Sequence, residues 1–340
     1  MAKIISERYS GLDILKALSA FAVVCIHAGS LPVCGGSQIA LCRFAVPIFF
    51  MITGFFYCGT VKRKNEIKQI KKILFMLLGS MLLYFLWQIV IAVKGHSTED
   101  ITKLFTVKNA VKFLIFNDPP FGGHLWYLSA VLYVLVIVFL LRKFFPNKYK
   151  NILYAVTPFL LLGDLAIGKY SILLFEREFP YIIVRNFLFA GIPCFTIGLF
   201  LREKENLILK ISKNIRLLFV IIFVITNILE HYILVFFVVN AKRDNYISTT
   251  LLAIALFALF MDRSWNDGNF GLIKTIGKDY SAIIYIIHLI FVKIAFNLSK
   301  MLHISDVYGI VAPVVIFVLS CAAAWSVVQV KKRIALRRNY

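Results

Sequence analysis

The sequence has few charged residues and no segment between its apolar runs that is long enough for a soluble domain. Charged residues account for 16% of the 340 positions and hydrophobic residues for 60%, and the mean hydropathy is +0.83. A soluble globular chain carries about 45–50% apolar residues, because a domain of this size cannot hide more of them from water. The longest segment between apolar runs, 94–124, has room for one interfacial helix. We therefore expect residues 1–340 to form a single membrane domain with no soluble domain.

The cysteines lack the spacing of a metal site. They stand alone at positions 25, 34, 42, 58, 194 and 321, without the close pairs that bind zinc or iron–sulfur clusters. The sequence thus predicts no metal cofactor. Cys34 and Cys42 flank the first loop on the predicted outer side, where they either pair as a disulfide or remain thiols.

Apolar runs of roughly 20 residues, the length that a helix needs to cross the hydrocarbon core, recur along the whole chain. In lipid the backbone must form its hydrogen bonds within the segment, so these runs predict helices. The first run lacks a small-residue cleavage site and another run follows at once, so we expect a span and not a cleaved signal peptide. The sequence predicts an all-α polytopic membrane protein, a bundle of about ten transmembrane helices at 12–31, 39–60, 73–93, 125–141, 150–167, 181–201, 216–237, 247–261, 280–298 and 307–329.

The chain is strongly basic, with 38 Lys and Arg against 17 Asp and Glu and a formal net charge of +21. With the N-terminus inside, 25 of the 38 basic residues fall in cytoplasmic segments, nine in outer loops and four within spans. Because cytoplasmic loops of membrane proteins are enriched in Lys and Arg, this split predicts that both termini are cytoplasmic. It also accounts for most of the basic excess, so we expect no nucleic-acid partner.

Two polar residues interrupt the first apolar run, "GLDILKALSAFAVVCIHAG". Lys16 lies near its inner end, and His27 follows eleven residues later near its outer end. Eleven residues make three helical turns plus about 20°, so both side chains project from one face, about 16 Å apart along the axis. Such residues usually face a protein interior or a wet cavity. Each also has a structural alternative: Lys16 can extend to the interface, and His27 can hydrogen-bond a neighbouring carbonyl.

Further polar residues near the outer ends of the spans predict a half-buried vestibule open to the outside. Arg43 or Arg185 can instead pair with Glu230 for structure alone, and tryptophan and tyrosine at a span end also form ordinary aromatic belts. Pro47 predicts a kink in the span 39–60. The residues of this set are Arg43, His124, Trp126, Tyr127, Arg185 and Glu230, with His288 deeper, near the middle of its span.

Four segments together resemble the acyltransferase-3 family of integral membrane acyltransferases. "LDILKALSAFAVVCIHAG" is similar to the first-helix signature, in which a basic residue and a histidine are separated by ten residues; here Lys16 stands where Arg is commoner. "RFAVPIFFMITGFFY" resembles the second-helix block, "HLWYLSAVLYVL" the block with His-x-Trp, and "GKDYSAIIYIIHLIF" the late Ser-Tyr…His block. The four occur in order along the whole chain, which agrees with the ten-span count.

The resemblance implies transfer of an acyl group, usually acetyl, from cytoplasmic acetyl-CoA to a hydroxyl of a cell-envelope sugar at the outer face of a bacterial cell membrane. Lys16 would bind phosphate of the CoA, which serves as acyl donor. His27 would accept the acyl group or act as general base, and His288 would be a second acid or base. Arg43, or the edge formed by Trp126 and Tyr127, would stabilise the oxyanion. The substrate-binding candidates are His124, Trp126, Tyr127, Arg185 and Glu230.

One departure and one narrower similarity bear on function. Many family members carry a fused soluble esterase-like domain after the last span, whereas this chain stops at "KKRIALRRNY", which predicts an all-membrane mechanism or a separate soluble partner. The form of the second-helix block is most similar to the membrane half of the vancomycin-resistance membrane serine racemases. The alternative function is therefore uptake of L-serine, with Arg43 or Arg185 and Glu230 as partners for its charged groups.

Overall fold

The computed structural model describes residues 9–29, 36–94, 102, 104–241, 245–266 and 270–337. Every regular element in this part of the chain is a helix. Eight helices among the described residues are long and apolar enough to cross a membrane, and Ile247–Phe260 is a shorter apolar helix. The predicted all-α polytopic membrane fold is confirmed. The eight are Ser10–Ala28, Ser37–Lys62, Glu66–Val93, Gly123–Phe144, Tyr149–Ile167, Lys213–Phe236, Gly271–Met301 and Val307–Arg337.

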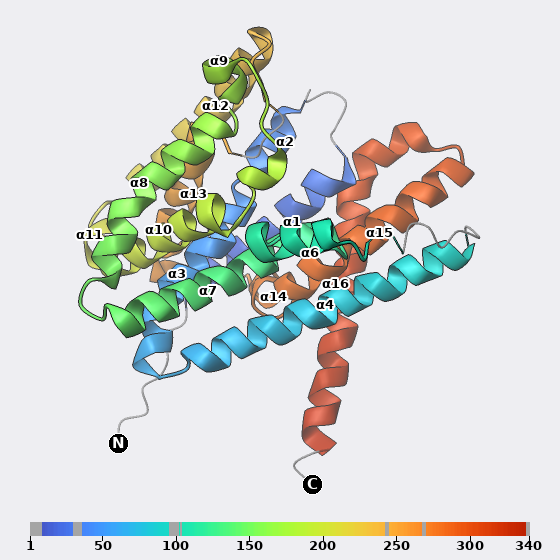
Figure 1. Ribbon diagram of the computed structural model, residues 1–340, viewed down its shortest axis with the longest axis horizontal. Helices are drawn as coiled ribbons and strands as arrows, with labels where there is room; N and C mark the ends of the chain where they lie inside the picture. The colour runs from blue at the N-terminus through green and yellow to red at the C-terminus, as the bar shows by residue number, and fades with distance from the viewer. Residues whose placement is uncertain are drawn as a thin grey trace. The chain divides into compact units, whose positions relative to one another are not determined.

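Figure 1 shows the helices of the described residues, coloured along the chain. The chain divides into two compact units, each made of separate stretches of the sequence. The first unit takes residues from 1–49, 205–234 and 246–340, and the second takes 50–204 and 235–245. Two helices belong to both units. The first residues of α3 (Ala45–Lys62) are in the first unit and the rest in the second, whereas only the last residues of α12 (Lys213–Phe236) are in the second unit.

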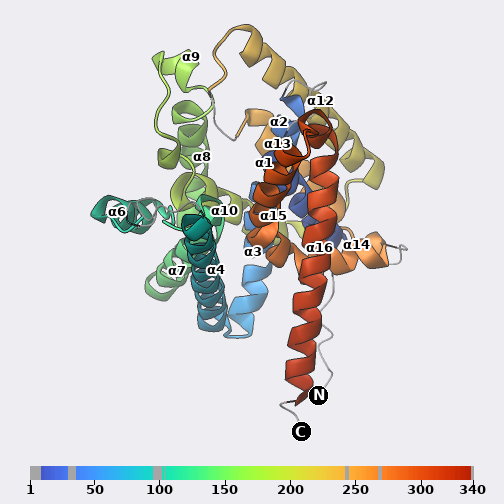
Figure 2. The ribbon, with the colours of Figure 1, turned by 90° about the vertical axis from the view of Figure 1, so that its right-hand side faces the viewer.

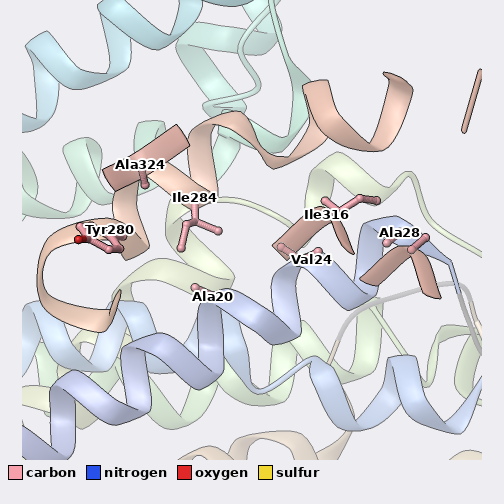
Figure 3. Close-up of a cluster of buried hydrophobic side chains, with 8 residues drawn as sticks. Ala20, Val24, Ala28, Tyr280, Ile284, Ile316 and Ala324 are labelled. Carbon is pink, nitrogen blue, oxygen red and sulfur yellow. The ribbon is translucent and has the colours of Figure 1, made fainter. Parts of the chain in front are cut away.

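The first unit is built around α1 (Ser10–Ala28), most of whose residues are buried. Ala20, Val24 and Ala28 stand one turn apart on α1 and pack in a core cluster with small and branched residues of α16 and the start of α15 (Figure 3). Small residues at this spacing let helix backbones approach closely, which is the usual way in which helices associate in lipid. The other helices of the unit are α2 (Ser37–Cys42), α11 (Glu205–Ile208), α13 (Ile247–Phe260), η5 (Arg263–Asn266), α14 (Gly271–Thr275), the π-helix η6 (Ile276–Tyr280), α15 (Ser281–Met301) and α16 (Ser305–Arg337).

The second unit depends on a close crossing of α3 and α10. A Cβ atom built on Gly54 would lie 1.9 Å from the carbonyl oxygen of Phe195, and one on Gly198 would lie 1.9 Å from that of Met51. Each glycine therefore makes room for the other helix's backbone. The other helices of the unit are α4 (Glu66–Lys94), α6 (Val107–Phe116), η2 (Gly123–Leu125), α7 (Trp126–Phe144), α8 (Tyr149–Ile167), α9 (Ser171–Phe175), η3 (Tyr181–Ile183), the π-helix η4 (Phe187–Gly191) and α10 (Ile192–Glu203).

Three predicted spans differ from the structure in a way that matters for the site. The span 39–60 is divided at Arg43 into α2 and α3, so the break precedes Pro47. Pro47 lies in the first turn of α3, where its missing N–H costs no intrahelical hydrogen bond. The span 181–201 consists of a 3₁₀ turn, the π-helix η4 and the 12 residues of α10. The span 247–261 is α13, with 14 residues.

A buried ion pair joins the inner ends of α12 and α13. The Arg216 guanidinium is 4% exposed, pairs with Asp262, and donates to the carbonyl oxygens of Ala258 at 2.8 Å and Ile211 at 3.1 Å. Burial acts to raise the pKa of the Asp262 carboxyl, but hydrogen bonds from Ser264 and Arg216 outweigh it and hold this pKa below its ordinary value. The pair thus links the first turn of α12 to the residue pair that follows α13.

We predict that Gly198→Ala destabilises the protein, because the added methyl group meets the carbonyl oxygen of Met51. Overpacking of this kind costs about 1–3 kcal/mol. Gly79→Ala is the matched control, since nothing lies within 4 Å of its built Cβ in the middle of α4. The control should keep or slightly raise the unfolding midpoint in detergent, and equal melting of both variants would contradict the close crossing.

We also predict a specific acid dependence from Asp262. A carboxyl whose pKa is lowered in the folded state stabilises that state at neutral pH, and this contribution is lost as the pH falls through the folded pKa, below about pH 4. The unfolding midpoint of the wild type should therefore drop in that range, and Asp262→Asn should drop less. Arg216→Gln should reduce the same acid dependence, and identical pH profiles for all three proteins would refute the assignment.

Candidate active site

Lys16 lies one turn after Asp13 on the same face of α1. Its ammonium is 3.2 Å from Asp13 Oδ1, with side chains 23% and 10% exposed respectively. The π-helix η6 packs directly against this turn, because a Cβ on Gly277 would lie 1.6 Å from the Asp13 carbonyl oxygen. The prediction that Lys16 stands alone near the inner end is corrected by the structure, because the lysine has a carboxylate partner in Asp13. The neighbouring η6 is a single-turn π-helix, an irregularity that often marks functional sites.

His27 and His288 come together in the first unit. Their ring centroids lie 5.2 Å apart, although the residues stand on α1 and α15. His27 is exposed and His288 is fully buried. Nδ1 of His288 lies 2.8 Å from the Tyr285 carbonyl oxygen and 3.1 Å from that of Ile284. A carbonyl oxygen only accepts, so Nδ1 carries the proton and Nε2 of the neutral ring holds the lone pair.

Arg43 stands half-buried in the break between α2 and α3, where its N–H donates to the Ala40 carbonyl oxygen at 3.2 Å. The preceding residue, Cys42, has its thiol hydrogen-bonded to that of Cys25 on α1. This contact ties α2 to α1 two residues before His27. The predicted alternative of a Cys34–Cys42 disulfide involves Cys34, which lies outside the described residues.

Glu230 holds the beginning of α13. Its carboxylate accepts hydrogen bonds from the backbone N–H groups of Ile247 and Ser248, both at 2.9 Å, and from the Ser248 hydroxyl. Asn227, one turn earlier on α12, donates to the same hydroxyl at 2.9 Å. An anion at a helix N-terminus satisfies open N–H groups and complements the helix dipole. Here Glu230 acts as a cap supplied by another helix.

The second unit gathers the His-x-Trp block beside Arg185. His124 is buried in η2, with its ring 4.7 Å from that of Tyr84 in an edge-to-face arrangement. The Arg185 guanidinium lies over the rings of Trp126, at 5.4 Å, and Tyr181, at 4.6 Å. A guanidinium over aromatic faces is attracted by their quadrupoles. The rings of Trp126 and Tyr181 therefore form an aromatic wall against which the Arg185 guanidinium packs.

Tyr127 extends this wall. Its ring packs edge-on against Phe50 at 4.7 Å, and its hydroxyl is hydrogen-bonded to Thr53. Asn117, which is fully buried, links the start of α7 to η4: its amide donates to the Trp126 carbonyl oxygen at 3.1 Å and accepts from the Phe187 N–H at 2.7 Å. One asparagine thus fixes the block relative to the segment that follows Arg185.

The structure distributes the predicted residues between the two units. The first contains Lys16, His27, Arg43, Glu230 and His288, and brings the two histidines into contact. The second contains His124, Trp126, Tyr127 and Arg185, and brings Arg185 to Trp126. Sequence reasoning missed Asp13, Tyr84 and Asn117, of which only Asp13 carries a signal, its spacing of three residues from Lys16. The described residues contain no group of three or more His, Cys, Asp or Glu side chains that could hold a metal ion.

Comparisons with known proteins agree with the sequence blocks. The chain is 27% identical over 321 residues to an amino-acid racemase of Enterococcus faecalis. The aligned region covers 88% of this chain and 43% of that protein. The chain thus spans less than half the length of this relative. No solved structure matches. The model of the family described as "Acyltransferase domain" matches residues 9–329, nearly the whole of the chain, which therefore belongs to the acyltransferase-3 family of integral membrane acyltransferases.

Proposed function

We propose that this protein transfers an acetyl group from cytoplasmic acetyl-CoA to a hydroxyl of a cell-envelope saccharide at the outer face of a bacterial membrane. The observation that carries the proposal is the contact between His27 and His288, whose ring centroids lie 5.2 Å apart. Acyl transfer to a hydroxyl needs a base that takes one proton and returns it, and a histidine does this near neutral pH.

In this mechanism His27 removes the proton from the acceptor hydroxyl as its oxygen attacks the thioester carbonyl carbon. The carbon–sulfur bond then breaks, and the His27 imidazolium returns the proton to the CoA thiolate. His288 is the proposed second acid or base beside it, held in place by the hydrogen bond from its Nδ1 to the Tyr285 carbonyl oxygen. Arg43 is the proposed donor to the oxyanion.

Lys16 is the proposed site for the CoA phosphates. Asp13 holds its ammonium in place at 3.2 Å, and α1 separates Lys16 from His27 by about 16 Å along the axis. A donor bound at Lys16 therefore has to extend along the helix to place its thioester at His27. For the second unit we propose that Trp126, Tyr127 and Arg185, with His124, bind saccharide hydroxyls. Glu230 then contributes by ordering α13.

A second candidate function is uptake of L-serine by a membrane domain of a serine racemase. The similarity to the amino-acid racemase of Enterococcus faecalis, of which the chain covers 43%, favours it. A carrier has to provide partners for a carboxylate and an ammonium. If the protein is a carrier, proteoliposomes should take up L-serine without acetyl-CoA, and the His27→Asn variant should still do so. If the protein is only an acetyltransferase, no L-serine uptake is expected.

We predict that His27→Asn lowers acetyl transfer from acetyl-CoA by about 10²–10⁴-fold, the range expected for loss of a general base. Release of the CoA thiol by the purified protein in lipid nanodiscs, with envelope saccharide added, measures the rate. His288→Asn should lower kcat by a smaller factor with little change in KM. His303→Asn, at an exposed turn in the same unit, is the matched control, and loss of activity there equal to that of His27→Asn would refute the assignment.

For Lys16 we expect a change in donor binding and not in chemistry. A hydrogen bond to a charged group contributes about 1.5–3 kcal/mol, so Lys16→Gln should raise the KM for acetyl-CoA by roughly 10- to 100-fold. Lys16→Arg should bind at least as well, because Arg offers phosphate a bidentate contact. Lys210→Gln, an exposed lysine of the inner side, is the control. An unchanged KM in Lys16→Gln would overturn the proposed role.

A further inference from the structure

The helix α6 (Val107–Phe116) presents an apolar stripe that no other described part of the protein covers. None of its residues is buried. Val107, Leu114 and Ile115 are 82%, 67% and 57% exposed. Together with Ala110 and Val111 they follow the spacing i, i+3, i+4, i+7 and i+8, which places them on one side of a helix. In Figure 2, α6 projects to the side of α4 and α7.

The opposite side of α6 is fixed to the second unit. The Tyr133 hydroxyl of α7 donates to the Phe113 carbonyl oxygen at 3.0 Å. Directly after the helix, the Asn117 side chain bonds both the Trp126 carbonyl oxygen and the Phe187 N–H. These contacts orient α6, so the direction of its apolar stripe is set by the fold.

The beginning of α6 is held as well. Phe105 packs against Phe85 of α4 at 5.8 Å and against Phe121 at 5.5 Å. The Thr106 hydroxyl caps the helix by accepting from the Asn109 N–H at 3.3 Å. A ten-residue helix is marginal in isolation, so the anchors at both ends indicate a helix that is kept in place to present its free side.

Positive charge lies along one edge of the stripe. Lys108 and Lys112 are one helical turn apart and project about 100° and 140° around the axis from Val107, between the stripe and the attached side. Residues 104–117 contain no Asp or Glu. An apolar face edged by lysines is the composition of a helix that lies in a membrane interface and attracts anionic lipid. The charge distribution of the chain places this segment on the outer side.

We propose that α6 binds anionic phospholipid, with the stripe of Val107, Val111, Leu114 and Ile115 among the acyl chains and with Lys108 and Lys112 on headgroup phosphates. Free phosphate would pair with the lysines but would leave the apolar stripe exposed to water. An anionic lipid pairs with the lysines through its headgroup and covers the stripe with its acyl chains. Because Asn117 joins the end of α6 to Trp126 and Phe187, lipid at α6 also steadies the start of the His-x-Trp block.

Hydrogen exchange of the full-length protein in nanodiscs tests this proposal without any measurement of activity. The probes are nanodiscs of phosphatidylcholine alone and of a 7:3 mixture with phosphatidylglycerol. Two interfacial lysines should slow exchange of the α6 amides on the order of tenfold in the anionic bilayer. The double variant Lys108→Gln/Lys112→Gln should lose this difference, and Lys108→Arg/Lys112→Arg should keep it.

Lys300→Gln is the matched control, an exposed lysine of another predicted outer loop, and it should leave α6 exchange unchanged. Leu114→Gln/Ile115→Gln should raise α6 exchange in both bilayers, because it removes the apolar contact. Equal α6 exchange in the two bilayers for the wild type would overturn the proposal. Protection that rises with protein concentration instead of anionic lipid content would also overturn it and would assign the stripe to a second copy of the chain.

Discussion

Polar groups inside a membrane protein must find their partners in the protein itself, because hydrocarbon provides none. The first unit is arranged around this constraint at three levels of α1 and its neighbours. At the inner end Asp13 pairs with Lys16. Near the outer end the ring of His27 contacts that of His288, whose Nδ1 is hydrogen-bonded to the Tyr285 carbonyl oxygen. At the beginning of α13 the Glu230 carboxylate takes the open backbone N–H groups.

Departures from regular α-helix lie beside three of the candidate site residues, Lys16, Arg43 and Arg185. The π-helix η6 comes so close to α1 at Asp13 that only glycine fits at position 277. Arg43 lies half-buried in the break between α2 and α3. The π-helix η4 follows the segment of Arg185, and the Asn186 side chain caps it by accepting from the Leu188 and Phe189 N–H groups. Irregular backbone in a membrane protein is tolerated where side chains or other helices satisfy it. At η4 the Asn186 side chain meets this need.

The two units use different chemistry. The first has acid, base and ammonium groups on and around one central helix, and its core of small residues on α1 lets α15 and α16 come near. The second has an aromatic wall in which the Arg185 guanidinium is the cation and Asn117 the buried link. In the function we propose, the first set transfers the proton and binds the anionic donor, and the second binds the hydroxyl-rich acceptor.

The sequence by itself determined the membrane class, the helical fold and the family, because apolar runs of span length and four ordered blocks are local features that survive any arrangement of the helices. It also singled out Lys16 and His27 as members of one helix. Only the tertiary structure decided that His27 meets His288, that Glu230 caps α13, and that Asn117 joins α6 to the aromatic block. These contacts join residues up to 261 positions apart, and their existence depends on which helices pack together. The break at Arg43 could not be predicted from the sequence either, because the hydropathy stays high on both sides of it. Where a helix stops depends on the groups that pack against its backbone.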